Sequence, residues 1–222
     1  RDQPRSRGLG DVYKRQLQEP SMSVRNLIRR SGVTLICTTD DPADSLYWHK
    51  ELAADDSFEV QVLPAWRPDK AMNIEKPEYL DYLNTLSDVS GIKVNSFASL
   101  MDALRNRMQF FDSMGCSVSD HALEYVMYKP YTDAEIEAIF AKRLSGEAIT
   151  TEEMNKFKTA FMVSVGKEYN KLNWVMQLHY GTIRDNNVFR YNQLGPDTGF
   201  DCINTYDCSA AVSYTHLTLP TT

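Results

Sequence analysis

The sequence lacks most of the signals that mark the common classes of binding protein. No apolar run approaches the roughly 18 residues of a membrane span, so we expect no membrane association. Neither G-x-G-x-x-G nor G-x-x-x-x-G-K-S/T occurs, which counts against a nucleotide-binding loop. Lys and Arg number 24 against 30 Asp and Glu, a formal net charge of −6. Because nucleic-acid binders usually carry a basic face, we expect no nucleic-acid partner.

Metal-binding motifs are also missing. The four cysteines form no C-x-x-C pair, which argues against a structural zinc site of that kind. Cys37 and Cys116 lie in apolar, strand-like runs, and we expect them to be buried free thiols of a cytoplasmic protein. No His-x-His pair occurs anywhere in the sequence. What is present is 222 residues, 42% hydrophobic and 24% charged, a composition typical of a globular domain.

Both ends of the chain differ in composition from the rest. Residues 1–16 hold five basic residues, two acidic residues and few apolar ones, and residues 212–222 contain no Asp, Glu, Lys or Arg. We interpret both ends as non-native, adapter-like or disordered sequence, a native disordered tail being the alternative. The fold is therefore assigned to residues 17–211, and His216 is excluded from any site.

The body of the chain alternates between strand and helix patterns. Short apolar runs predict strands, and amphipathic runs with capping residues predict helices. The expected strands are residues 32–37, 59–64, 116–119 and 174–178, and the expected helices are residues 77–86, 96–114, 132–144 and 151–171. This alternation favours an α/β fold with a parallel sheet, either an open doubly wound sheet or part of a (β/α) barrel.

Polar residues with useful chemistry follow each expected strand. They are residues 38–41, residues 67–70, residues 119–121, and His179 with Arg184 and Asp185. In both candidate architectures the carboxyl ends of parallel strands converge on the ligand site. We therefore expect these side chains to share one cleft, the alternative being a set of helix caps and loop ion pairs.

Each of these side chains can have more than one role. Arg67 can grip a carboxylate with its planar fork or form a loop salt bridge to a nearby Asp. Asp120 can accept a proton, orient a hydroxyl or cap a helix. His179 can be a ligand, an acid–base group or a satisfied core histidine. His121 is expected to be structural, and His49 is expected to lie on the surface of a helix.

Five segments resemble the signature stretches of uronate isomerases, also called glucuronate isomerases. They are CTTDDPADSLYWHK (37–50), VLPAWRPDKA (62–71), VSDHALE (118–124), MQLHYGTIRDNN (176–187) and LGPDTGFDCI (194–203). The segments occur in the family's order and at its approximate spacing, over about residues 17–211. The resemblance implies membership of the amidohydrolase superfamily and a (β/α)8 TIM barrel.

The resemblance also implies an activity and a site. Uronate isomerases interconvert D-glucuronate with D-fructuronate, and D-galacturonate with D-tagaturonate. The resemblance implies that Arg67 binds substrate and that Asp120 and His179 are catalytic residues. It further implies a divalent metal, expected to be zinc, held by a His-x-His pair on the first barrel strand and an Asp on the last.

This sequence departs from the family pattern in extent. It supplies four expected strands, which the resemblance identifies as the second to the fifth, and it lacks the metal-binding His-x-His. We therefore expect an internal fragment that forms a partial barrel, whose partner is a small sugar acid and which is inactive alone. The alternatives are a metal-dependent hydrolase of the same superfamily and a non-catalytic sugar-acid binding domain.

Overall fold

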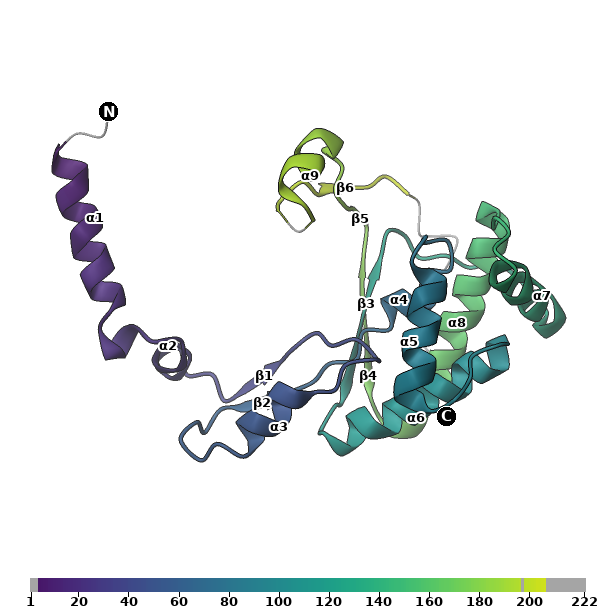
Figure 1. The fold of residues 1–222 in the computed structure, drawn as a ribbon, viewed down its shortest axis with the longest axis horizontal. Helices are drawn as coiled ribbons and strands as arrows, with labels where there is room; N and C mark the ends of the chain where they lie inside the picture. Colours follow the sequence, from purple (N-terminus) through teal and green to yellow (C-terminus); the bar gives the residue numbers. More distant parts are fainter. Residues whose placement is uncertain (1–3, 197, 207–222) are drawn as a thin grey trace. The chain divides into compact units, whose positions relative to one another are not determined.

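The structure is a computed structural model that describes residues 4–196 and 198–206 (Figure 1). The chain divides into two compact units. The first comprises Arg1–Thr38 with Leu46–Leu63, and the second comprises Thr39–Ser45 with Pro64–Thr222. Each unit contains a pair of parallel strands. None of the described helices is long and apolar enough to cross a membrane.

The first unit is built on two short strands. Its elements are α1 (Pro4–Leu17), the 3-10 helix η1 (Pro20–Met22), α2 (Val24–Arg30), β1 (Leu35–Cys37), α3 (Tyr47–Ala53) and β2 (Gln61–Leu63). β1 and β2 pair in parallel, with Leu35 opposite Gln61. Helix α2 is tied to the segment before β2 because Arg29 forms an ion pair with Glu59 at 2.9 Å.

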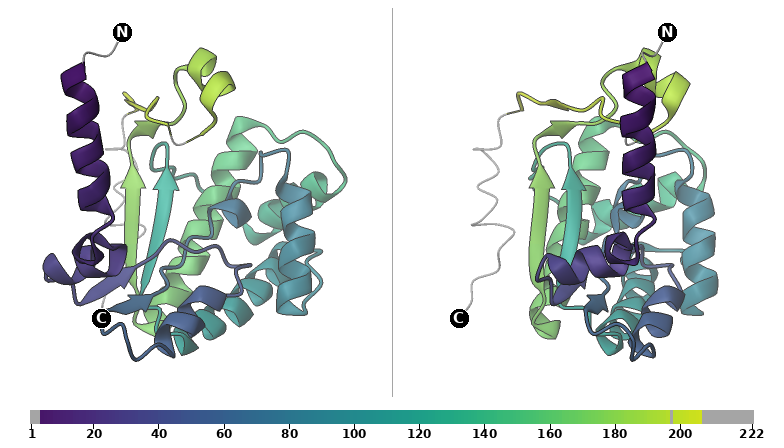
Figure 2. Two further views of the ribbon diagram at one scale, coloured as in Figure 1. Left: turned by 60° about the vertical axis from the view of Figure 1, so that its left-hand side comes forward. Right: turned by 90° about the vertical axis from the view of Figure 1, so that its left-hand side faces the viewer.

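The second unit contains the longer strands and most of the core. Its elements are α4 (Asp69–Met72), α5 (Tyr79–Ser90), α6 (Phe97–Ser113), β3 (Val118–Leu123), α7 (Asp133–Leu144), α8 (Thr151–Leu172), β4 (Val175–Tyr180), β5 (Thr182–Ile183), α9 (Val188–Leu194) and β6 (Cys202–Ile203). β3 pairs with β4 in parallel, and β5 pairs with β6 in antiparallel orientation. Helices α5 to α8 gather on one side of the β3–β4 pair (Figures 1 and 2).

Parallel pairing in the second unit extends beyond β3 and β4. Trp66 forms parallel bridges both to Asp40 and to Ser119 of β3. Four chain segments therefore lie side by side in the order Asp40, Trp66, β3, β4, all running in one direction. This arrangement agrees with the parallel sheet that the alternating sequence pattern predicts.

The helices begin where the sequence places capping residues. Thr132 accepts a hydrogen bond from the main-chain N–H of Glu135, and the Glu135 side chain accepts from the N–H of Thr132, so the expected capping box is present. α8 has the same arrangement at Thr150 and Glu153. Asn173 ends α8 in the left-handed conformation, with φ 59°, and the chain turns directly into β4.

The core of the second unit is aromatic. Phe157 of α8 is fully buried and packs against four other rings, with centroid distances of 5.6 to 6.4 Å, from Tyr79, Phe97, Phe140 and Phe161. Trp66 is also fully buried, and its ring lies 5.0 Å from Phe111 in an edge-to-face arrangement. These contacts hold the helix layer against the strands that carry the site residues.

The two faces of β3 have different surroundings, because successive side chains of a strand point to opposite faces. Ser119 and His121 are fully buried, and His121 contacts a ring of α8. Asp120 and Ala122 point to the opposite face, which they share with Gln177 and His179 through the β3–β4 register. That face is open, since Ala122, Gln177 and His179 are all exposed.

Strand lengths are the main difference between the expected and observed elements. The sequence predicts a strand over residues 116–119 that ends before Asp120, whereas β3 continues to Leu123. It also predicts a strand over residues 174–178, whereas β4 extends to Tyr180 and includes His179. Asp120 and His179 belong to these strands because a strand face that is not covered by helices does not need apolar side chains. His121, in contrast, is a buried polar residue on the helix-covered face.

Two side chains lie in environments opposite to those expected. Cys37 is exposed rather than buried, because β1 has an exposed–intermediate–exposed pattern, whereas Cys116 is buried as predicted. His49 is 8% exposed rather than on the helix surface, and its Nε2 lies 2.7 Å from the Thr38 hydroxyl. That polar contact is what allows a histidine to occupy the buried side of α3.

The beginning of the chain is more regular than its composition predicts. The sequence shows no helical periodicity over residues 1–16, yet Pro4–Leu17 form α1. Arg, Lys, Leu and Gln favour helices locally without burying a face, and residues 11–17 are all exposed. The interpretation of residues 1–16 as a non-native end stays a prediction, and residues 212–222 lie outside the described residues.

The aromatic core gives a first testable prediction. Replacing Phe157 by Ala leaves a cavity among the surrounding rings, so we expect the free energy of unfolding to fall by about 3–5 kcal/mol. Urea unfolding followed by circular dichroism measures the change. The matched control is Phe189→Ala on α9, where the side chain is 66% exposed and we expect a change within about 0.5 kcal/mol. Equal effects of the two substitutions would contradict this account of the core.

Candidate active site

The candidate site is built around the carboxylate of Asp120 on β3. The main-chain N–H of Asp120 donates to the carbonyl oxygen of Trp66 at 2.8 Å, which places the following residue, Arg67, beside the Asp120 side chain. The Nη2 group of Arg67 donates to Oδ2 of Asp120 in a close ion pair. Asp120 is 7% exposed, so this charge lies in a partly dehydrated environment where the pairing is stronger than in water.

His179 meets the same carboxylate from β4. Its Nε2 lies 2.9 Å from Oδ1 of Asp120, while Oδ2 faces Arg67. The register puts Ala122 opposite His179, so His179 reaches Asp120 diagonally across the open face of the strand pair. Thr39 adds a third contact, since its hydroxyl donates to Oδ2 of Asp120 at 3.4 Å.

The three predicted site residues therefore lie together, as the single-cleft hypothesis requires. The three residues come from three segments of the parallel arrangement, and Arg67 and His179 both contact the carboxylate of Asp120. The group contains a fixed cation, a carboxylate that can accept a proton and an imidazole, half exposed, that can give or take one. Such a set can bind an anionic ligand and move a proton next to it.

A second carboxylate, that of Asp69, lies near the Nε atom of Arg67. Its Oδ2 lies 3.8 Å from Nε of Arg67, and its side chain is 18% exposed. The carboxylate also accepts the main-chain N–H of Ala122, at 3.2 Å and 3.4 Å to its two oxygens. Burial raises the pKa of Asp69 to about 6, although the Ala122 hydrogen bond and the charge of Arg67 act in the opposite direction.

His121 occupies the helix-covered face of β3 and is separate from this cluster. It is fully buried, and its ring centroid lies 5.7 Å from that of Tyr169 on α8. Burial, helped by the nearby positive charge of Arg67, lowers the pKa of His121 to about 3. The imidazole is therefore neutral at physiological pH, which agrees with the structural role expected for it.

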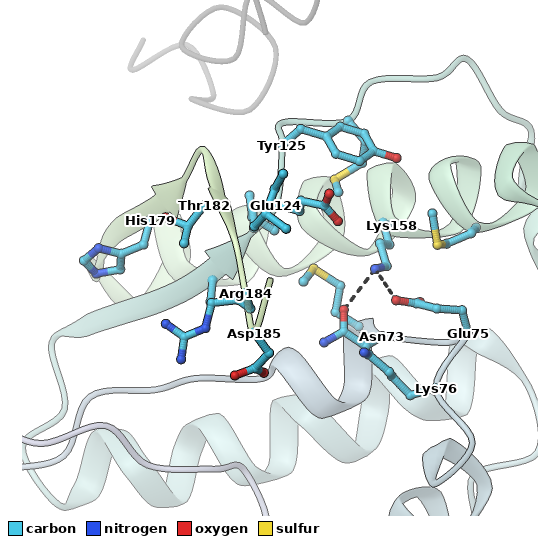
Figure 3. Close-up of a pocket in the computed structure, with 16 residues that line it drawn as sticks. Asn73, Glu75, Lys76, Glu124, Tyr125, Lys158, His179, Thr182, Arg184 and Asp185 are labelled. Carbon is cyan, nitrogen blue, oxygen red and sulfur yellow. Dashed lines mark hydrogen bonds and ion pairs between the residues drawn. The ribbon is translucent and has the colours of Figure 1, made fainter. Parts of the chain in front are cut away.

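A pocket of about 500 Å³ opens beside the Asp120 cluster, with His179 in its wall (Figure 3). Arg184 and Asp185, which the sequence places after the fourth strand, line the same side of the pocket as His179 (Figure 3). Lys158 and Glu75 line the other side. Because its lining carries both charges, the pocket suits a polar ligand rather than an apolar one.

Lys158 is one of the pocket residues that the sequence did not predict. It lies on α8 and is 7% exposed, and its Nζ is 2.8 Å from Glu75 and 3.0 Å from Asn73. A signal for it exists in the sequence. Lys158 lies four residues after Met154 and three before Phe161, so a charged residue interrupts an apolar stripe of helical spacing. A lysine in such a position is buried only when it has a partner.

The described residues do not form a metal site by themselves. No group of three or more His, Cys, Asp and Glu side chains suited to a metal occurs within residues 4–196 and 198–206. Asp120 and His179 provide at most two donors, and both oxygens of Asp120 already face other groups. A catalytic zinc takes three protein ligands. The donor set of the described residues therefore does not fit a resident catalytic metal.

Comparisons of the sequence with known proteins all match members of one family. The sequence profile of the family described as glucuronate isomerase matches residues 8–218. A uronate isomerase of Lachnospira eligens is 84% identical over 198 residues, which cover 89% of this chain and 42% of that protein. A uronate isomerase of Lachnoclostridium phytofermentans is 69% identical over 206 residues, which cover 91% of this chain and 44% of that protein. The chain thus spans about two fifths of the length of these relatives.

Solved structures resemble the fold over a similar extent. The crystal structure of uronate isomerase from Thermotoga maritima matches with a TM-score of 0.82 and 34% identity, covering 88% of this chain and 44% of that one. The crystal structure of glucuronate isomerase from Caulobacter crescentus matches with a TM-score of 0.84 and 27% identity, covering 93% of this chain and 43% of that one.

The raised pKa of Asp69 predicts a pH-dependent effect on stability. A carboxyl group whose pKa is higher in the folded than in the unfolded chain destabilises the fold once ionised, so the penalty is absent below pH 4 and complete above about 6. The rise from an ordinary value near 4 corresponds to about 3 kcal/mol. Asp69→Asn removes the charge and keeps an acceptor for Ala122, so we expect the variant to be more stable than wild type at pH 8.

Urea unfolding of both proteins at pH 8 and pH 4 measures this difference, which should disappear at pH 4. The control is Asp88→Asn on α5, where the side chain is exposed and we expect a small effect at either pH. A wild type that is more stable than Asp69→Asn at pH 8 would contradict the prediction.

Proposed function

This chain belongs to the glucuronate isomerase family, and we propose that it is an internal portion of a uronate isomerase that interconverts D-glucuronate and D-fructuronate. The same reaction type would convert D-galacturonate to D-tagaturonate. The observation that carries the proposal is the convergence of Arg67, Asp120 and His179 on one open face, within segments that the family profile covers. The family match does not favour a hydrolase or a non-catalytic binding domain.

The available groups suit an aldose–ketose isomerisation. This reaction moves a proton between C1 and C2 through an enediol-like intermediate, and it needs a base, stabilisation of oxygen charge and a hold on the substrate carboxylate. We assign Arg67 to the carboxylate or another substrate oxygen. An arginine carries five N–H donors, so Arg67 can hold Asp120 and still donate to a substrate.

The other two residues act on protons and oxygens. We assign Asp120 to proton transfer or to orientation of a substrate hydroxyl, and His179 to binding of a substrate oxygen. Arg67 offsets the charge of Asp120, and the contact from His179 limits how that carboxylate can rotate. Oδ2 of Asp120 thus faces Arg67 and Thr39, while Oδ1 lies 2.9 Å from His179, an arrangement that restrains the carboxylate relative to an incoming sugar.

We further propose that the chain forms strands two to five of a (β/α)8 barrel in the complete protein. The parallel pairing and the alternation of strands with helices support this assignment, and active sites of such barrels lie at the carboxyl ends of the strands. The divalent metal of the complete enzyme would take its ligands from segments that this chain does not contain.

The assignment of Arg67 is testable in a full-length chimera, defined as the Lachnospira eligens relative with its matching segment replaced by this chain. Arg67→Lys keeps the charge but loses the planar fork, so we expect kcat/KM for glucuronate to fall about 100-fold with the fold intact. The control is Arg105→Lys on α6, a half-exposed arginine that pairs with Asp102 and Glu168. Near-normal kinetics of Arg67→Lys would show that this residue does not hold the substrate.

The assignment of Asp120 gives a different kinetic signature in the same chimera. Asn cannot take up a proton as a carboxylate does, so Asp120→Asn should lower kcat by about 100-fold or more while KM changes little. Steady-state kinetics with glucuronate separates the two constants. A loss confined to KM would assign Asp120 to substrate binding rather than to proton transfer.

The chain as written should not isomerise glucuronate, even with zinc or manganese supplied. Asp120 and His179 fall short of the three protein ligands that a catalytic metal needs. The measurement is an assay for fructuronate on the purified, soluble chain. Metal-dependent turnover that His179→Ala abolishes would contradict this prediction, because it would mean that the chain holds a complete metal site.

A further inference from the structure

We propose that Asp69 is a positioning residue, which attracts the Nε end of the Arg67 guanidinium while Asp120 pairs with Nη2, so that Arg67 presents a fixed fork to the carboxylate of the sugar acid. The inference rests on the proposed function for the identity of the substrate. The Asp69–Arg67 contact itself can be tested without any activity.

Asp69 takes the place of a backbone acceptor in the hydrogen-bond ladder of β3. The N–H of Asp120 donates to the carbonyl oxygen of Trp66, and two residues later the N–H of Ala122 points to the same side of β3. The chain after Trp66 has by then turned into α4, and the Asp69 carboxylate accepts the Ala122 N–H in place of a backbone carbonyl. Asp69 therefore fixes the β3 peptide that lies opposite His179 in the register.

The hydrogen bond from Ala122 does not need a charged acceptor. A neutral amide in the same position would accept the Ala122 N–H, and it would avoid the cost of burying a carboxylate. Asp69 is nevertheless an acid whose side chain is 18% exposed. A partly buried charge without structural necessity is a common mark of a functional site.

Charged groups surround Asp69. The groups that face it are Arg67 from the preceding loop, Asp120 from β3, and Lys158 and Tyr169 from α8. Arg67 is the cation that contacts it, with Nε 3.8 Å from Oδ2, while Nη2 of the same guanidinium pairs with Asp120. With one carboxylate 3.8 Å from Nε and another paired with Nη2, the guanidinium has two anionic neighbours, and together they restrain its orientation more than a single partner does.

This role predicts a dependence on pH. Below about pH 6 Asp69 takes up a proton, and Arg67 then keeps Asp120 as its acidic partner but loses the second anchor. Binding of the sugar acid should therefore weaken as the pH falls through 6, even though the fold itself gains stability in that range. If Asp69 only supported the fold, its protonation would stabilise the fold and would not weaken binding of the sugar acid.

The test uses the full-length chimera with Asp69→Asn and Asp69→Glu. We expect Asp69→Asn to raise KM for glucuronate about tenfold with a smaller change in kcat, because Arg67 loses orientation and not charge. The rise of kcat/KM with pH near 6 should be reduced in this variant. Asp69→Glu restores the charge and should regain part of kcat/KM. If the side chain were needed only for the Ala122 hydrogen bond, Asn would behave like wild type and Glu would be the worse variant.

A second readout needs no turnover. In ¹⁵N NMR spectra of the chain as written, the Nε–Hε signal of Arg67 should shift with a midpoint near pH 6, and the shift should be absent in Asp69→Asn. Normal KM and an unchanged pH profile in Asp69→Asn would overturn the positioning role, as would an Arg67 signal that does not respond to Asp69. A wild-type chimera without glucuronate turnover would instead refute the proposed function, while the NMR result would still decide whether Asp69 holds Arg67.

Discussion

Two backbone hydrogen bonds join Trp66 to β3, one to the carbonyl of Val118 and one from the N–H of Asp120. The relative positions of Arg67 and Asp120 depend on this pairing, because one residue follows Trp66 and the other is bonded to it. Trp66 itself is held by the packing of its fully buried ring against Phe111. The geometry of the site therefore depends on the packing of the core. A hydrophobic contact on the other side of the strand thus holds the oppositely charged Arg67 and Asp120 beside each other.

Much of this arrangement could be predicted from the sequence, because the spacing of apolar residues and the residues that cap a helix are local properties. Helices over residues 96–114, 132–144 and 151–171 follow from apolar spacing and from Ser or Thr caps, and the structure places α6, α7 and α8 there. The polar residues after each apolar run could likewise be assigned to one end of a parallel sheet. The contact of Arg67 and His179 with Asp120 follows from that placement.

What the sequence could not supply depends on contacts between distant segments. The burial of Asp69 arises because β3 continues past Asp120 and leaves the Ala122 N–H without a backbone acceptor, and no local pattern encodes that. The burial of His49 depends on a single hydroxyl eleven residues earlier, at Thr38. Helix α1 shows the reverse case, in which local propensity forms a helix without an amphipathic pattern to reveal it.

The tryptophans differ in exposure between the two units, so the two units differ in how their fluorescence responds to unfolding. The sequence contains three tryptophans. Trp48, in the first unit, is 73% exposed, whereas Trp66 and Trp174, in the second, are almost fully buried, with ring centroids 6.1 Å apart. Indole emission shifts to longer wavelength when a buried ring becomes exposed to water. The wavelength of intrinsic fluorescence therefore reports unfolding of the second unit and changes little when the first unit unfolds. The close pair of buried indoles also provides a near-ultraviolet dichroism band that reports the packing directly behind the Asp120 carboxylate.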